Sequence, residues 1–268
     1  TTYVPVALGP RTETVELTVT RQPACSSIYP PLTELIERIP ALVVIEPEST
    51  MSIDLEPLDD WCAANDVGHV DVLKVDTQGS ELGVFEGATK ALSTCVLVES
   101  EVEFNPIYSG QPLFADVDAF LRSQGFVLWR LDNFAHYTDS DVIPRLDGAL
   151  TIFTDATPRE VRIGGGQLYW ADAFYVRADL CGPADALDPA YARRAARIAR
   201  AAGFPDLAAR ILPSTGDELV AEADEARLER ERQRRRERRA ARAARAAAAP
   251  APPRRSFARR VVGRLLRR

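Results

Sequence analysis

Residues 70–87, VDVLKVDTQGSELGVFEG, join an apolar strand to a glycine turn and a helix. The strand half is almost continuously apolar, which is typical of a parallel strand in a sheet with helices on both faces. Asp76 follows this strand, Gly79 permits a tight turn, and Ser80 is placed to cap the next helix. Because open α/β sheets bind ligands at the carboxyl ends of their strands, the segment predicts a ligand site around Asp76.

Other segments have the patterns of further strands and helices. We expect strands at Tyr3–Leu8, Glu13–Thr20, Cys95–Val102, Phe126–Leu131 and Ala149–Phe153, of which the last closes the set and is antiparallel. We expect helices at Leu58–Asn65, at Ala115–Gln124 before Gly125, and at Tyr191–Leu212. Strands that alternate with helices at this spacing predict an α/β fold with a mostly parallel sheet.

Composition supports one sizeable core and excludes several classes of site. The chain has 268 residues, 46% of them apolar, and no apolar run of the length that a membrane span requires. No signal peptide is visible, and the four cysteines are scattered without metal-ligand spacing. We therefore predict reduced thiols, a cytoplasmic location and no metal site.

Charge is divided sharply along the chain. Residues 227–268 contain 17 arginines and only three glutamates, although the whole chain has a net charge of −6. Residues 227–249 lack Gly and Pro and predict a solvated helix, and Ser256 is placed to cap a short amphipathic helix after it. This arm favours contact with an anionic membrane surface, at the inner membrane face, over nucleic acid, because no aromatic stacking residues accompany the arginines. A solvated arm that folds back on the acidic part is the alternative.

One long motif resembles a known family. The run LKVDTQGSELGVFEGATKAL, with LDDW before it and VLVESEVEFNPIYSGQPLF after it, resembles the FkbM family of S-adenosylmethionine-dependent methyltransferases. The resemblance covers about Tyr3 to Thr154, and Gln167–Arg177 resembles an extension of some members. It implies a Rossmann-like class I methyltransferase sheet and S-adenosyl-L-methionine as cofactor. The implied reaction is methyl transfer, usually to an oxygen of a small molecule or a glycan.

Family members begin with a strand, a glycine-rich turn and a second strand that ends in an acidic residue. This sequence contains none of these three features, so we interpret Tyr3–Leu8 as the third strand of an amino-terminally truncated chain that is inactive alone. We divide it into a partial methyltransferase domain at 1–155, an extension with alanine-rich helices at 156–226 and the basic helical arm at 227–268. The glycines at 164–166 are predicted to form a loop after the last core strand and not a cofactor site.

The candidate catalytic residues are carboxylates at the ends of neighbouring strands. Asp76 is the first candidate, and Glu99 or Glu101 is the second. Each could accept the proton of an acceptor hydroxyl, because a protonated hydroxyl is a poor nucleophile. The structural alternative for Asp76 is a turn in which its carboxylate accepts from the amides of Gln78 and Gly79.

Further candidates follow from the topology and the resemblance. Gln78 and Glu81 are predicted to bind acceptor hydroxyls, with a first-turn charge as the alternative for Glu81. Asn105 and Tyr108 belong to a loop that resembles an acceptor-side segment, with a plain loop as the alternative. The family architecture implies that the cofactor lies against the turn after the first strand here and against Asp76. The residues of that turn are Val6, Ala7, Leu8 and Gly9.

Two other functions fit these residues. One is a non-catalytic binding module on a methyltransferase-like fold, because a fold does not determine a function. The other is a sugar-modifying transferase of another reaction class. The sequence identifies neither the acceptor nor an oligomeric state.

Overall fold

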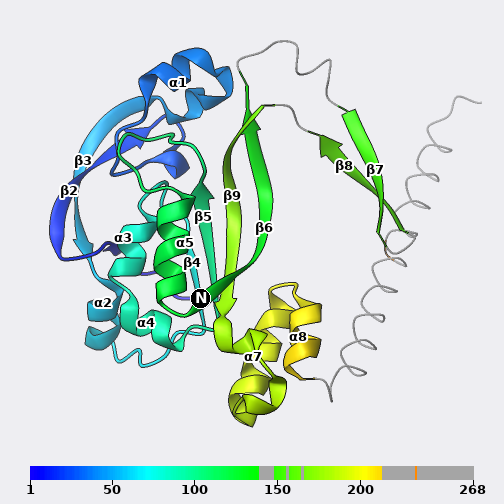
Figure 1. Cartoon of the computed structure of the whole chain (residues 1–268). Helices are drawn as coiled ribbons and strands as arrows, with labels where there is room; N and C mark the ends of the chain where they lie inside the picture. The colour runs from blue at the N-terminus through cyan, green and yellow to red at the C-terminus, as the bar shows by residue number, and fades with distance from the viewer. Residues whose placement is uncertain (139–147, 155–156, 164–165, 213–232, 234–268) are drawn as a thin grey trace, which may run out of the picture. The chain divides into compact units, whose positions relative to one another are not determined.

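The computed structural model describes residues 1–138, 148–154, 157–163, 166–212 and 233 (Figure 1). The predicted basic arm at 227–268 lies, apart from Gln233, outside the described residues. The strands are β1 (Ala7–Leu8), β2 (Glu13–Thr20), β3 (Pro47–Glu56), β4 (Val72–Val75), β5 (Leu97–Glu103), β6 (Phe126–Tyr137), β7 (Gly148–Thr154), β8 (Thr157–Ile163) and β9 (Gln167–Arg177). The helices are α1 (Thr33–Arg38), α2 (Leu58–Ala64), α3 (Glu81–Glu86), α4 (Thr89–Thr94), α5 (Phe114–Ser123), α7 (Pro189–Ala201) and α8 (Pro205–Ile211).

The strands form a mixed α/β architecture with separate sheets. The largest described sheet has the strand order β4-β5-β9-β6, in which β4 and β5 are parallel and β9 is antiparallel to both of its neighbours. A second sheet has the order β1-β3-β2, and β7 pairs with β8 alone. The carboxyl ends of β4 and β5 therefore lie side by side, as their parallel direction requires.

Three helices cover one face of the large sheet (Figure 1). Alternate residues of the strands point to this face, and those of β9 include Ala173 and Tyr175, neither of which is exposed. They pack against the apolar sides of α3, α4 and α5, represented by Phe85, Leu92 and Leu121. This core holds β4 and β5 in place from one side and leaves their other face for polar residues.

Several predicted elements are confirmed, and others are wrong. β2 has the predicted bounds, and α2 and α5 agree with prediction to within one residue at each end. The expected closing strand at Ala149–Phe153 instead pairs with β8 outside the large sheet, and β9 is inserted between β5 and β6. Because β9 is antiparallel to both β5 and β6, the strands β4, β5 and β6 all run in the same direction, so the large sheet is mostly parallel as predicted and β9 is the strand that opposes the others. The glycines at 164–166 consequently precede the last strand of the sheet.

Gly87 lies where the connection between α3 and α4 approaches the end of β1. A Cβ at this position would overlap the carbonyl oxygen of Gly9. The Gly87 carbonyl accepts from the amide of Asp59, and the Asp59 carboxylate accepts from the amides of Lys90 and Ala91 at the start of α4. The absence of a side chain at Gly87 thus lets the end of β1 lie close to the helices around the site.

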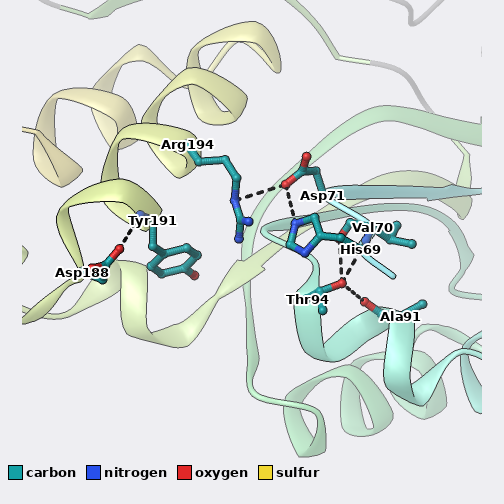
Figure 2. Close-up of polar contacts among 8 residues, drawn as sticks. All are labelled: His69, Val70, Asp71, Ala91, Thr94, Asp188, Tyr191 and Arg194. Carbon is teal, nitrogen blue, oxygen red and sulfur yellow. Dashed lines mark hydrogen bonds and ion pairs between the residues drawn. The ribbon is translucent and has the colours of Figure 1, made fainter. Parts of the chain in front are cut away.

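The amino end of β4 is held by polar contacts from two helices (Figure 2). Thr94 at the end of α4 bonds through Oγ1 to both the amide (3.0 Å) and the carbonyl (3.1 Å) of Val70. Asp71 lies 2.9 Å from His69 Nε2 and 3.2 Å from Arg194 Nε of α7. These contacts connect α7 to the strand that ends at the candidate site.

The loop between α7 and α8 also covers part of the sheet. Phe204 is 1% exposed and meets Phe174 of β9 edge to face, with 5.4 Å between ring centroids. The Arg130 guanidinium of β6 lies 4.3 Å from the Phe204 ring centroid, a geometry that favours cation–π attraction. The alanine-rich helices are therefore packed against the sheet by an aromatic residue that neither helix contains.

Candidate active site at the carboxyl ends of β4 and β5

The turn after β4 places Asp76 at the surface and returns the chain into α3. Gln78 and Gly79 both have left-handed backbone angles, with φ of +56° and +96°. Gly79 adopts such an angle without strain, whereas a residue with a Cβ does so at a cost. Two successive left-handed residues reverse the chain sharply, so that Asp76 is exposed while Glu81 is only 2% exposed.

Glu81 organises this turn. Its Oε1 accepts from the Thr77 amide (2.7 Å), the Thr77 hydroxyl (3.2 Å) and the Gly79 amide (3.2 Å). The predicted Ser80 cap is wrong, because Ser80 donates its hydroxyl to the Thr77 carbonyl and accepts no helix amide. The turn role considered for Asp76 thus belongs to Glu81, whose longer side chain reaches back to the buried amides.

Asp76 and Glu101 form a carboxyl pair between the two strand ends. The Nε2 group of Gln78 donates to Asp76 Oδ1 (3.0 Å) and to Glu101 Oε2 (3.2 Å). Burial raises the pKa of Glu101 to about 9, and a hydrogen bond that the protonated Glu101 carboxyl donates to Asp76, together with the negative charge of Asp76, acts in the same direction. Glu101 therefore holds a proton at neutral pH, and the exposed Asp76 is the member of the pair open to a bound molecule.

Glu99 lies on the same face but outside the pair. Its Oε1 is 2.6 Å from the Lys74 ammonium, and the two residues are directly opposite each other on β5 and β4. The ammonium thus neutralises Glu99 and separates it from the proton chemistry of Asp76.

The residues predicted to line the acceptor side form contacts inside the protein. Tyr108 is 1% exposed, and its hydroxyl lies 2.8 Å from the Cys25 carbonyl and 3.1 Å from Gln78 Oε1. Asn105 donates to the Leu168 carbonyl (2.7 Å) and accepts from Gln167 (2.8 Å). Tyr108 is close to the pair through Gln78, whereas Asn105 connects its loop to β9.

A cavity of about 370 Å³ opens between β1 and the end of β4. Its lining includes the predicted cofactor-side residues Val6, Ala7 and Leu8 together with Asp76. Gly9 instead lines a neighbouring cavity of about 300 Å³ on the side of α3. The fold thus brings four of the five residues into one pocket, although about 70 positions separate β1 from Asp76 in the sequence.

The contact between Ser27 and Gln78 could not be predicted from the sequence. The Ser27 hydroxyl donates to the Gln78 carbonyl over 2.7 Å, from a segment 51 residues earlier. Ser27 thereby connects the loop before α1 to the turn after β4. Local patterns do not report such contacts, because they depend on how distant elements pack.

The remaining expectations about ions and membranes concern the described part of the chain. Its residues contain no group of three or more potential metal ligands, and its four cysteines are free. None of the helices described is both long and apolar enough to cross a membrane.

The buried carboxyls predict a stability that decreases as pH rises. Glu101 and Glu103 have pKa values of about 9 and about 8, against 4.5 for an ordinary glutamate, and burial is the main cause for both. Between these limits the folded chain binds more protons than the unfolded chain, so each group lowers the free energy of unfolding by up to about 1.4 kcal/mol per pH unit. Their stabilising effect is complete below about pH 4.5 and is lost as pH rises through about 8 to 9.

Urea denaturation between pH 5 and pH 8 measures this slope. Glu103→Gln should flatten it, since an amide does not titrate. Val102→Ala, a core substitution on the same strand, controls for lost stability and should shift the curve without changing its slope. Equal slopes for the wild type and Glu103→Gln would contradict the assignment.

Comparison with known proteins finds a family to which this region is similar. The model of the methyltransferase FkbM domain matches residues 2–128. Residues 2–128 are therefore similar to the methyltransferase FkbM domain. The matched region contains Asp76, Gln78, Glu81 and Glu101, and therefore the whole turn and carboxyl pair.

A curated protein has a similarity of the same kind. The chain is 31% identical over 72 residues to the 2-O-methyltransferase NoeI of Sinorhizobium fredii (strain NBRC 101917 / NGR234). The matched segment is 26% of this chain and 30% of that protein. No solved structure matches the chain.

Proposed function

We propose that the protein is an S-adenosylmethionine-dependent O-methyltransferase that acts on a hydroxyl of a glycan or small molecule. The observation that carries the proposal is the cavity between β1 and β4, because an exposed carboxylate lines it at the end of a parallel strand. The similarity of residues 2–128 to the methyltransferase FkbM domain supports the reaction class. The name of the NoeI relative, a 2-O-methyltransferase, supports oxygen as the acceptor atom.

The lining of the cavity fits the proposed cofactor. Leu8, Ile53, Leu55 and Val84 provide an apolar part, which suits a purine ring, and Asp76 provides a negative end. Its volume lies within the range of small-molecule sites, about 300 to 1,000 Å³. When bound, S-adenosylmethionine supplies an electrophilic methyl group on a positively charged sulfur.

The chain's own residues then perform the acid-base part of the reaction. Asp76 faces the cavity and accepts the proton of the acceptor hydroxyl, which raises the nucleophilicity of the oxygen. Glu101 holds a proton next to it and hydrogen-bonds to the Asp76 carboxylate, so that the charge of the base is stabilised. Apolar lining residues exclude water from the reacting atoms, and the rigid strand ends hold them in orientation.

The test uses the protein expressed from its complete reading frame. It is incubated with methyl-¹³C-labelled S-adenosylmethionine and a panel of oligosaccharides, with the same oligosaccharides fully O-methylated as the matched control. We expect products that gain one labelled methyl group on oxygen, located by NMR, and none from the control. Binding of the donor without transfer to any hydroxyl would instead favour a binding module, and transfer to nitrogen or carbon would contradict O-methylation.

A further inference from the structure

Gln78 adopts a backbone conformation that its residue type disfavours. Its φ of +56° lies in the left-handed region, and it is followed by Gly79, for which such an angle is ordinary. A residue with a β-carbon carries backbone strain at such a position, and the contacts around it have to offset that strain. The side chain of Gln78 is therefore the feature to explain.

Every polar group of the Gln78 side chain has a partner. Nε2 donates to one oxygen of Asp76 and one of Glu101, and Oε1 lies 3.1 Å from the Tyr108 hydroxyl. The backbone carbonyl accepts from Ser27 over 2.7 Å. The amide therefore lies between the two carboxyls on one side and a buried tyrosine on the other.

We propose that Gln78 is a positioning residue that holds the Asp76 and Glu101 carboxyls next to each other at the ends of β4 and β5. A side-chain amide can make all three contacts at once, because its two N–H groups donate to two acceptors while its oxygen accepts from a third group. A third carboxylate at this position would repel the pair. Any effect of Gln78 on methyl transfer rests on the proposed function. Its effect on the arrangement of the two carboxyls does not.

Other charges also act on the pair. Glu101 faces Asp76 from β4, Glu103 on its own strand, Glu81 from α3 and Asp172 directly opposite on β9. These are all acidic, and burial together with Asp76, Glu103 and Glu81 favours the protonated form of Glu101. The N–H bonds of Gln78 oppose this effect, because they stabilise the carboxylate form.

The test measures the titration of the Glu101 carboxyl in the whole 268-residue chain. Side-chain ¹³C NMR of glutamate-labelled protein follows it, and loss of one signal in Glu101→Gln assigns it. With Gln78→Leu or Gln78→Gly we expect the midpoint to rise by about one pH unit, the effect of a lost hydrogen bond to a charged group. Gln124→Leu, at the end of α5, is the matched control and should leave the midpoint unchanged.

Gln78→Leu and Gln78→Gly together distinguish the loss of the side-chain hydrogen bonds from the effect of backbone strain. Glycine relieves the left-handed strain and leucine retains it, so their stabilities should differ while their midpoints shift alike. If Leu alone fails to fold, the Gly variant still measures the shift. Unchanged midpoints in the folded variants would overturn the proposal.

Tyr108→Phe provides a second measurement, because it removes the hydroxyl next to Gln78 Oε1 without touching either carboxyl. We expect a smaller upward shift in the same direction, and no shift would show that Tyr108 does not orient the amide. In the protein from the complete reading frame, Gln78→Leu should lower kcat and move the pH profile, with little change in KM for the methyl donor. A midpoint shift without any methyl transfer by the wild type would reject the proposed function and retain the positioning role.

Discussion

Asp76→Asn is expected to lower kcat for methyl transfer by about 100- to 10,000-fold, the usual contribution of a general base. The amide occupies the same space at the end of β4 but does not take up a proton from the acceptor hydroxyl. Asp76 is exposed and lines the cavity, so its carboxylate is the one that a bound acceptor can reach. Single-turnover kinetics with labelled methyl donor would isolate this loss from product release.

Two neighbouring glutamates provide the controls for this result. Glu101→Gln should retain much more activity than Asp76→Asn, since Glu101 is already protonated at neutral pH and glutamine resembles that form. Glu99→Gln should have a small effect because Glu99 is paired with Lys74 outside the carboxyl pair. A large loss in Glu99→Gln with near-normal activity in Asp76→Asn would assign the base to Glu99 instead.

Glu81→Leu is expected to lower the free energy of unfolding by about 3 to 5 kcal/mol. The substitution leaves the amides of Thr77 and Gly79 without their acceptor, and each unsatisfied buried donor costs about 1 to 3 kcal/mol. The loss of the bond to the Thr77 hydroxyl adds to this. Urea denaturation monitored by tryptophan fluorescence provides the measurement.

Glu81→Gln is the matched control, because its amide oxygen can still accept from the same backbone groups. Its cost should be below about 1.5 kcal/mol, the usual net value of one neutral hydrogen bond. Burial raises the pKa of Glu81, so a neutral side chain is tolerated at this position. Equal destabilisation by Leu and Gln would mean that the charge, and not the turn geometry, is what the fold requires.

Local patterns in the sequence predicted the elements that surround the site. The alternation in Glu13–Thr20 and the apolar run before Asp76 have the periods of strands, and both segments form strands. The helix before Gly125 ends as predicted, with Gly125 at φ +83°. β3 was not predicted, although the alternate apolar residues Ile53 and Leu55 at its end were a usable signal.

The order of the strands could not be obtained in this way. β9 lies between β5 and β6, so its neighbours in space are about 70 and 40 positions earlier in the chain. Ala149–Phe153 has an equally good strand pattern but pairs with β8. A strand pattern shows that a segment can pair, and the partner depends on which apolar faces become buried together.

By itself the sequence determined that a strand ends at Asp76, that a glycine turn follows, and that the region resembles a methyltransferase, because these properties depend on neighbouring residues. Only the tertiary structure decided the roles within the site. It paired Asp76 with Glu101, gave the turn to Glu81 and placed Gln78 between the carboxyls and Tyr108. Hydrogen bonding and burial set these roles, and both depend on contacts between segments that are distant in the chain.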